Sequence, residues 1–554
     1  MSEKKPISRR TFLAYLGTGA AAIVAASSGL GAFQGKAFAA DTLFSLQTNK
    51  ITDAFQPIEP ASSGELLLPK GFKAHVLAAY GDSINPKGDV FGYGSSFTRF
   101  FPIDGSNVKG LLWVNHASDH HGPHNGRRTD GQLSLAQIKA TLANQGASII
   151  EIYRDQDGDW KMDTESANAR RITGYDPFEL TGPARGSQSV HGAATVQGTV
   201  ACGSGVQTLW STVLCGEGRF GAIGRDTGLD QTHYGWIWEG HPGDRSFQLR
   251  KHTALGRFQH GGAAMTLSKD SRVVVYMGGS AAHECIYKFV SKGTYAASAG
   301  KANAELLTEG KLYAADLEKG QWIELTIEAV RRTLDDSDFR VPSPLNKRKE
   351  TLTDLFREQA DVLTHAHEAA VILGATPTDR PAGLALHPSD GSLYVSHTSH
   401  ARHGNIHGYM NRVIEKNGDP GADSFDFDVA SAGGSSSGYS CPESMSFDSN
   451  GNLWTASDMP ADKLNQGTIA AFKNNGLYLL PASKKQGGSA LQFASAPGSA
   501  HFAGQSFAPD ERTLFLSVQQ PEPGESAPSS GAWPNRPGDR VPLPAVVAIS
   551  GFHA

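Results

Sequence analysis

Apolar and polar residues alternate in short runs along most of the chain, and turn-forming residues separate the runs. Four segments share one template: an alternating apolar strand, a turn of Asp, Asn, Gly or Ser, and a second apolar strand that ends in polar residues. This pattern predicts β-hairpins with matched register. The four segments begin at Gly261, Arg380, Pro442 and Ala503.

Two earlier segments fit a looser form of the template, with LLWVNH from Leu111 and TLWSTVLCGE from Thr208 as the second strands. Six such hairpins predict an all-β fold, a β-propeller of about six blades with inserted loops and short helices, because radial repetition leaves only short, protected sheet edges. Two β-sandwiches are the alternative, since the spacing of the segments is irregular. Helical periodicity is limited to residues 134–145 and 352–370.

The first 39 residues differ in composition from the rest. Arg9 and Arg10 precede an apolar stretch that ends in a small-residue cleavage site, which predicts a twin-arginine (Tat) signal peptide over residues 1–39. We expect the Tat translocon to export the protein, so the mature chain is predicted to be periplasmic or secreted. Residues 40–67 are expected to form a linker or arm, and residues 68–554 the propeller domain. No other stretch approaches the ~20 apolar residues of a membrane span.

Charge and motifs exclude several classes of function. Removing the predicted signal takes away five basic residues and one acidic residue, so the net charge changes from −5 to about −9, which argues against a nucleic-acid partner. The four cysteines are irregularly spaced without a CxxC pair, which excludes a zinc ribbon, and their pairing cannot be read from the sequence. A phosphate-binding P-loop and a Gly-x-Ser-x-Gly elbow are both missing from the sequence.

Polar and charged side chains follow the second strands of the predicted hairpins. Equivalent strand ends in a propeller meet around the central channel, so these side chains are expected to converge. A set of His, Glu and Asp at one funnel is what a metal site requires, because hard cations take carboxylate oxygens and borderline cations take imidazole. The residues concerned are His116, Glu217, Glu284, His397, His400, Asp458, Gln519 and Gln520.

Several longer motifs run in order from about Leu68 to the C-terminus: GFKAHVLAAYGD, FGYGSSF, LLWVNH, ARRITGYDPFELTGPA, WSTVLCGE, YGWIWE, HTALGRFQHGGA, VVYMGGSAAHECIYKFVS, GATPTDRP and FAPDERTLF. In this order they resemble the PhoX-type alkaline phosphatases. The resemblance implies export by the Tat route, a propeller fold, and hydrolysis of phosphate monoesters. It also implies iron and calcium ions held in the funnel by glutamates and one cysteine.

The resemblance assigns roles position by position. Cys202 stands where the family has its metal-bridging cysteine, and Glu217 and Glu284 stand at metal-binding glutamates. Arg380, in TDRP, matches an arginine used near phosphate, which makes it the predicted catalytic residue. Three further residues complete the predicted metal ligands. His116 and His260 lie beside family motif positions, and Asp458 follows the end of a predicted strand.

Other family glutamates are replaced in this chain. The replacements are Ala117, Gly216 or Gly218, Gly261, Ala382, and the pair Ala500 and His501 in place of Cys-Glu. Because calcium takes about six to eight oxygen ligands, we expect a reduced calcium complement. Many histidines lie in or beside the same segments, so a metal that favours imidazole, such as zinc, is one alternative, and ordinary solvated loops are the other. Those not named above are His120, His121, His124, His403 and His407.

The sequence therefore predicts an exported, metal-dependent hydrolase that acts on a small phosphorylated substrate. Two rival functions stay open. One is a propeller that hydrolyses carboxylic esters or lactones, and the other is a catalytically inactive periplasmic binding protein.

Overall fold

Short, mostly antiparallel sheets make up the greater part of the computed structural model, which describes residues 55–117, 133–345, 348–482, 489–519 and 533–552. The predicted signal peptide, most of the predicted linker, Gln520, and the histidines His120, His121 and His124 lie outside the described residues. Within them, no helix combines the length and the apolar character needed to cross a membrane. The four cysteines all fall in the described part, where they are buried and not joined in disulfides.

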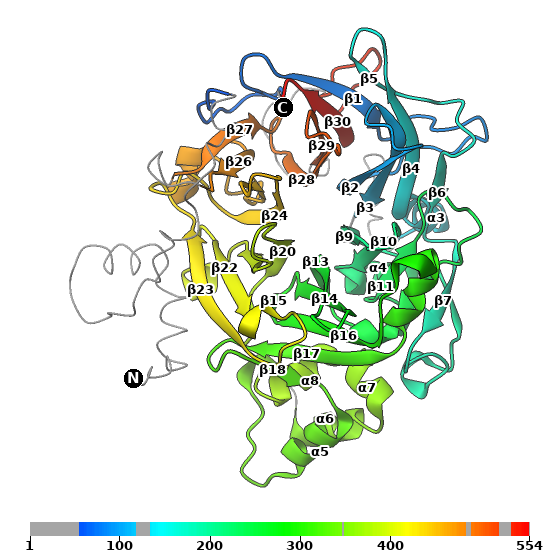
Figure 1. Ribbon diagram of the computed structural model, residues 1–554, viewed down its shortest axis with the longest axis vertical. Coiled ribbons are helices and arrows are strands. Elements are labelled where there is room, and N and C mark those ends of the chain that lie inside the picture. Colours follow the sequence, from blue (N-terminus) through cyan, green and yellow to red (C-terminus); the bar gives the residue numbers. More distant parts are fainter. Residues whose placement is uncertain (1–54, 118–132, 346–347, 483–488, 520–532, 553–554) are drawn as a thin grey trace, which may run out of the picture.

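Six sheets of four or more strands, counted over the described residues, stand around a common centre, each with one strand innermost (Figure 1). One runs β2 (Ser95–Pro102), β3 (Lys109–His116), β4 (Gly146–Arg154), β5 (Trp160–Met162), with β6 (Arg170–Ile172) beside β4. The next runs β9 (Cys202–Gln207), β10 (Val213–Glu217), β11 (Ile237–Gly240), β12 (Arg250–His252), β7 (Pro177–Thr181), β8 (Thr195–Gln197). The third runs β13 (His260–Leu267), β14 (Arg272–Gly279), β16 (Ile286–Thr294), β17 (Gly310–Asp316), β18 (Gln321–Glu324).

The remaining sheets continue around the centre. One runs β20 (Pro381–Leu386), β21 (Leu393–His397), β22 (Tyr409–Glu415), β23 (Phe425–Ala432), and the next runs β24 (Pro442–Phe447), β25 (Leu453–Ser457), β26 (Gly476–Leu480), β27 (Leu491–Ser495). The last runs β28 (His501–Phe507), β29 (Thr513–Gln519), β30 (Ala545–Ser550), β1 (Lys73–Ala79). A small two-stranded sheet pairs β15 (Ala282–Glu284) with β19 (Thr378–Asp379).

The six predicted hairpins are confirmed as the two innermost strands of these sheets. In each, the start of the first strand pairs antiparallel with the end of the second, as in Pro381 with His397 and Pro442 with Ser457. Each inner strand then carries an irregularity of one extra residue, as between Pro442 and Met445. Such β-bulges bend a strand and re-aim its side chains. The bulges therefore lie at the end of each sheet where the predicted site residues were expected.

The two ends of the described chain meet in one sheet. Strand β1 pairs antiparallel with β30, from Lys73 opposite Ser550 to Ala79 opposite Ala545. The paired strands are rich in Ala, Val and Ile, and β30 is almost wholly buried. The first and last described strands thus complete one sheet of the ring by main-chain hydrogen bonds.

Helices occupy connections between the strands. The prediction over residues 134–145 is confirmed by α3 (Leu135–Asn144), which begins with a capping box between Ser134 and Gln137. The region 352–370 forms three short helices rather than one: α6 (Lys349–Leu355), α7 (Gln359–Thr364) and α8 (Ala366–Ile372). The expectation of only two helical regions was wrong, because α4 (Phe220–Thr227) and α5 (Ile327–Asp335) also form. Glycines at positions 221 and 224 conceal α4 in the sequence, since glycine is a poor helix former.

Short 3₁₀ helices complete the connections: η2 (Gln188–Val190), η3 (Gln231–His233), η4 (Thr253–Leu255), η5 (Ala297–Leu307), η6 (Ser343–Leu345), η7 (Ala401–His403), η8 (Lys416–Gly418) and η9 (Gly467–Phe472).

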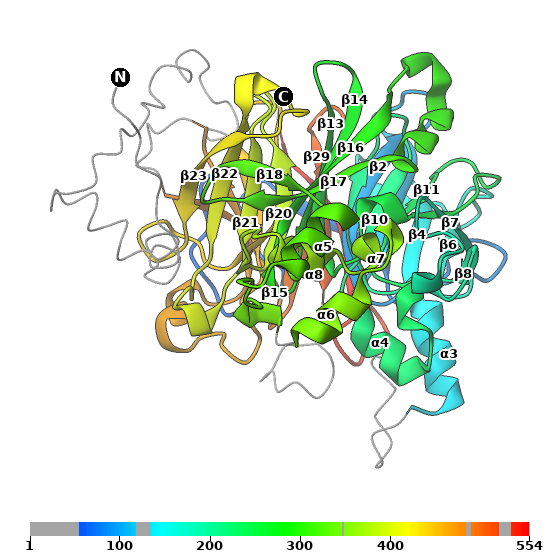
Figure 2. The same ribbon diagram turned by 90° about the horizontal axis from the view of Figure 1, so that it is seen from below.

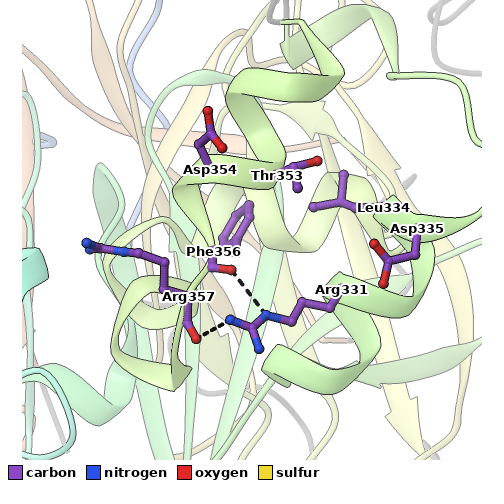
Figure 3. Close-up of a pocket in the computed structure, with 7 residues that line it drawn as sticks. All are labelled: Arg331, Leu334, Asp335, Thr353, Asp354, Phe356 and Arg357. Atoms are coloured by element: carbon purple, nitrogen blue, oxygen red, sulfur yellow. Dashed lines mark hydrogen bonds between the residues drawn. The ribbon is translucent and has the colours of Figure 1, made fainter.

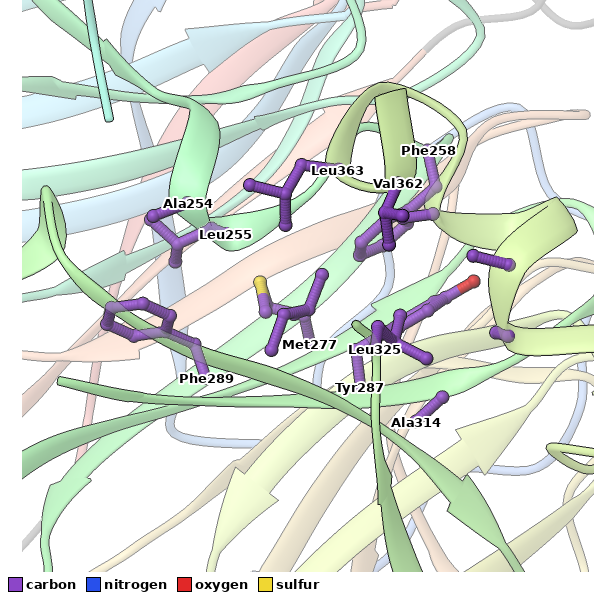
Figure 4. Close-up of a cluster of buried hydrophobic side chains, with 14 of the residues drawn as sticks. Ala254, Leu255, Phe258, Met277, Tyr287, Phe289, Ala314, Leu325, Val362 and Leu363 are labelled. Carbon is purple, nitrogen blue, oxygen red and sulfur yellow. The ribbon is translucent and has the colours of Figure 1, made fainter. Parts of the chain in front are cut away.

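The largest hydrophobic cluster joins these helices to the sheet of β13, β14 and β16–β18 (Figure 4). Leu363 and Val362 of α7 face Met277 of β14 and Tyr287 of β16, and all four are buried. Burial of a side chain of this size contributes roughly 1.5–3 kcal/mol of stability. The helical layer is therefore held to one sheet by apolar packing, while the centre of the ring carries polar side chains.

Candidate metal and phosphate site

One end of the six inner hairpins brings polar residues from separate sheets to the same side of the ring. The first strand of each hairpin begins there and the second strand ends there. Figure 2 shows α4 and β15 toward one side of the ring, and both lie next to these strand ends in the chain. The paired residues at these ends are Ser95 and His116, Cys202 and Glu217, His260 and Gly279, Pro381 and His397, Pro442 and Ser457, and His501 and Gln519.

Glu443, Asp458 and His501 converge at this end. One ligand atom of each lies within 4.8 Å of the others, and all three side chains are half-buried. Glu443 is the second residue of β24, Asp458 follows β25, and His501 begins β28 of the neighbouring sheet. Two carboxylates and one imidazole from two sheets therefore form a group that could hold a metal ion.

Two arginines act on this group. Burial and the nearby Asp458 raise the pKa of Glu443, whereas His501, Arg380 and Arg219 oppose that shift. Arg380 lies between β19 and β20 and has φ of 58°. Its Nε donates to the carbonyl of Ser280 at 3.4 Å. The predicted phosphate-binding arginine is thus within electrostatic reach of the carboxylates.

Close backbone packing holds Glu443 in place. A side chain on Gly383 of β20 would overlap the carbonyl oxygen of Glu443, so only glycine permits this approach of the two sheets. The same carbonyl accepts a hydrogen bond of 2.6 Å from the hydroxyl of Ser396. The neighbouring sheet therefore sets the position of Glu443.

Cys202 lies apart from this group, in a closed environment. Its sulfur accepts from Nε1 of Trp238 at 3.2 Å and lies 3.0 Å from the hydroxyl of Thr199. Burial and the neighbouring Glu217 raise the pKa of the thiol to about 12. A metal-bound cysteine must be a thiolate, which these surroundings disfavour.

Glu217 is the centre of a buried ion pair. Its Oε1 accepts from Nζ of Lys251 at 2.7 Å, and both side chains are fully buried. Its Oε2 accepts from the backbone N–H groups of Gly235 at 2.9 Å and Trp236 at 3.1 Å. The ammonium of Lys251 also donates to the carbonyl of His233 at 2.9 Å. The carboxylate is therefore neutralised and hydrogen-bonded within the protein.

Glu284 is likewise engaged by protein groups. Tyr287 donates its hydroxyl to Oε1 at 2.6 Å, and Nδ1 of His367 lies 2.7 Å from the same oxygen. Although burial opposes protonation of His367, the charge of Glu284 raises its pKa to about 11. A protonated His367 therefore balances the charge of Glu284.

The two predicted histidine ligands are buried in separate places. Nε2 of His116 lies 2.7 Å from the hydroxyl of Ser148, and burial holds its pKa well below the usual value. The ring of His260 packs against Phe258 with centroids 3.8 Å apart, and burial lowers its pKa to about 3. Both imidazoles are neutral, and neither belongs to the group around Glu443.

The donor sets decide which ions the residues fit. The sulfur of Cys202 and the carboxylate of Glu217 both contact protein groups, so an iron or calcium ion at these residues would have to compete with Trp238 and Lys251. The group of Glu443, Asp458 and His501 fits iron or zinc by its mixed oxygen and nitrogen donors. With two carboxylates it falls short of the six to eight oxygens of about 2.3–2.6 Å that calcium takes.

Sequence reasoning brought Asp458 and Arg380 to this site but missed Glu443 and Arg219, and it also missed Lys251, the partner of Glu217. Glu443 had a signal: it follows Pro442 as Ala382 follows Pro381, so it occupies the matching position one sheet further on. The roles of Arg219 and Lys251 depend on contacts between strands and had no signal in the local pattern.

The remaining histidines divide between two places. His400 and His403 lie together with His283, and these three form a second group that could bind a metal. His407 contacts Ser440 instead, with Nδ1 3.0 Å from its hydroxyl.

A pocket lies among α5, α6 and the residues after α6 (Figure 3). None of its lining residues belongs to either group of candidate metal ligands. Nε of Arg331 donates to the carbonyl of Phe356 at 3.3 Å, and its Nη2 donates to that of Arg357. The guanidinium is thus engaged by the backbone. The pocket is lined by Arg331, Leu334, Asp335, Thr353, Asp354, Phe356 and Arg357.

Comparison with known proteins gives one extensive match. Residues 53–522 match the family described as alkaline phosphatase PhoX. Pseudomonas fluorescens PhoX, solved in complex with vanadate, a transition state analogue, is 27% identical, with a TM-score of 0.77 over 90% of this chain and 100% of its own. A Xanthomonas campestris gluconolactonase is 10% identical over 83% of this chain and 96% of its own, but its TM-score of 0.29 supports no conclusion. No curated protein matches the chain.

Proposed function

Because the chain belongs to the alkaline phosphatase PhoX family, a family of hydrolases, we propose that it hydrolyses phosphate monoesters with a metal ion held by Glu443, Asp458 and His501. The observation that carries this proposal is the convergence of these three donors beside Arg380 and Arg219. Carboxylates and guanidinium groups in one place suit a site that takes both a cation and an anionic phosphate.

Arg380 binds the phosphate of the substrate. A guanidinium offers several N–H donors in a planar fork, which matches two phosphate oxygens. The contact with the Ser280 carbonyl uses only Nε, so the terminal nitrogens remain for the ligand. Arg219, at the start of α4, adds a second positive charge beside the same carboxylates. Together they hold the phosphate and stabilise the charge that spreads over its oxygens during transfer.

When bound at Glu443, Asp458 and His501, a metal ion supplies Lewis-acid stabilisation of the transferring phosphoryl group. The donor set favours iron or zinc, with less calcium than the family resemblance implies. His501 stands where the resemblance places a family glutamate, so an imidazole takes over the place of a carboxylate.

The same proposal includes the finer fold and the location of the protein. We take the ring of six sheets to be a six-bladed propeller, one domain closed by the pairing of β1 with β30. Residues 1–39 would act as a Tat signal that carries the enzyme to the periplasm or outside the cell. This rests on the twin arginine and the cleavage pattern in the sequence.

The test is to express the protein with its own signal, purify it without chelators, and measure bound metals together with hydrolysis of p-nitrophenyl phosphate and p-nitrophenyl acetate. We expect stoichiometric metal and hydrolysis of the phosphate ester, with inhibition by vanadate. Glu443→Gln should lose metal and reduce kcat by about 100-fold or more. Arg380→Ala should keep the metal and raise KM about 10- to 100-fold, as for loss of a charged hydrogen bond.

Cys202→Ser serves as the control, since its sulfur lies in a closed environment. It should keep both metal and rate. Loss of metal in Cys202→Ser with full retention in Glu443→Gln would move the metal site to Cys202. Hydrolysis of the acetate but not of the phosphate ester would instead support the ester or lactone alternative, and absence of both activities would support a binding protein.

A further inference from the structure

Three histidines come together just after two of the inner strand ends, outside the group of Glu443, Asp458 and His501. His283 is the middle residue of β15, whereas His400 and His403 flank and end η7, in the connection between β21 and β22. The ring centroids of His400 and His403 are 3.8 Å apart, and that of His283 lies 5.0 Å and 4.9 Å from them. One ring nitrogen of each lies within 4.8 Å of the others.

A buried carboxylate orients one of these rings. Nδ1 of His403 lies 2.6 Å from Oδ1 of Asp379, which is itself fully buried in β19. The other carboxylate oxygen accepts from the amide of Asn405 at 3.2 Å. A carboxylate that holds one nitrogen of an imidazole fixes the tautomer and turns the other nitrogen toward a ligand. This is the usual outer-shell arrangement around a histidine that binds a metal.

The neighbouring ring has an unsatisfied nitrogen. Nδ1 of His400 is buried with no hydrogen-bond partner among the described residues. A buried polar atom without a partner is unfavourable unless another group satisfies it. A bound metal ion would satisfy this nitrogen.

The backbone supports the same interpretation. His283 has φ of 64°, in the left-handed region that a non-glycine residue rarely adopts within a strand. Pairing of Ala282 with Asp379 fixes β15 against β19, so His283 and the carboxylate that orients His403 share one small sheet. The three histidines and Asp379 therefore form a built constellation from three segments of the chain.

We propose that His283, His400 and His403 form a second metal site that takes a zinc-class transition ion, with Asp379 as the residue that orients His403. Three imidazole donors suit zinc, copper or nickel and not calcium or magnesium, which take oxygen ligands. The proposal does not depend on the phosphatase function, because its donors are separate from Glu443, Asp458 and His501. Asp379 directly precedes Arg380, so an ion here would also stiffen the backbone that carries the phosphate-binding arginine.

The experiment uses the full mature protein with Glu443→Gln and Asp458→Asn, which disables the other group. After treatment with EDTA and dialysis, Zn²⁺ binding is measured by calorimetry, and Co²⁺ binding by the visible bands of four-coordinate cobalt. We expect one equivalent of each ion. His400→Ala with His403→Ala should weaken Zn²⁺ binding at least 100-fold, and Asp379→Asn should weaken it about 10- to 100-fold.

His407→Ala is the matched control, a histidine of the same connection that contacts Ser440 and not the cluster. It should bind Zn²⁺ like the parent. Equal affinity in the His400 and His403 double variant, or no Zn²⁺ binding in the parent, overturns the proposal. If zinc binds as expected while the otherwise unchanged protein fails to hydrolyse p-nitrophenyl phosphate, the proposed function fails and this site stands.

Discussion

Replacing Lys251 with methionine tests whether Glu217 belongs to a buried ion pair. The Nζ and Oε1 atoms are 2.7 Å apart, and both side chains have no exposed surface. Methionine keeps the length of the apolar stem, including its packing near Tyr234, whose ring centroid lies 4.4 Å from Nζ. It removes only the charge and the donors, so the carboxylate loses its counter-ion inside the protein.

The expected magnitude follows from burial. Removing one partner of a buried pair destabilises a protein by about 3–5 kcal/mol, because an uncompensated charge stays out of water. Two backbone N–H groups remain on Oε2 of Glu217, which places the expected loss toward the lower end. With an unfolding entropy of about 2.1 cal/mol/K per residue, a loss of about 3 kcal/mol lowers the Tm of a chain of this length by roughly 3 °C.

The assay is urea unfolding and thermal melting of Lys251→Met, Glu217→Gln and the double variant. The double variant should recover about half of the loss or more, since a neutral glutamine needs no counter-ion. Metal content of Glu217→Gln should equal that of the parent. If Lys251→Met lowers the free energy of unfolding by less than about 0.5 kcal/mol, as an ordinary surface change does, the ion pair is refuted. If Glu217→Gln also loses its metal, Glu217 is a metal ligand.

Three further predictions concern packing and pH. Gly383→Ala should push β24 away and reduce kcat/KM by about 100-fold, while Gly203→Ala, whose new methyl meets only a side-chain carbon at 3.8 Å, should leave it within about twofold. Burial lowers the pKa of His397 to about 3, so the folded state binds fewer protons than the unfolded state below pH 6.5. The stability that this group contributes is therefore fully present above pH 6.5 and is about 2 kcal/mol lower at pH 5. Urea unfolding at pH 7 and at pH 5 should show that the free energy of unfolding drops by about 2 kcal/mol less in His397→Gln than in the parent. Leu363→Ala, in the cluster of Figure 4, should lower the free energy of unfolding by about 2–5 kcal/mol. The control Leu135→Ala changes an exposed side chain and should leave that free energy nearly unchanged. Equal effects of the two substitutions would contradict the packing.

Local patterns were enough to predict the hairpins and the ends where polar residues lie. Alternation of apolar residues and turn chemistry act within about 20 residues, so the hairpin of residues 442–457 could be predicted from the sequence, whereas the bulge between Pro442 and Met445 could not. The helix over 134–145 was predictable for the same reason, because its capping box is local. The helix α4 was not, since its glycines weaken the local signal and tertiary contacts decide.

Which polar residues meet was decided by the tertiary structure. Glu443 and Asp458 share a sheet, but His501 reaches them from the next sheet, and no local pattern specifies that neighbour. Glu217 and Lys251 stand 34 positions apart, on strands β10 and β12 that flank β11. The sequence by itself determined the repeated strands and the side of each hairpin where chemistry could occur, and it predicts an export signal over residues 1–39. Only packing between sheets determined which carboxylates are neutralised by protein cations and which remain beside arginines, because burial and charge pairing depend on distances that the chain order does not contain.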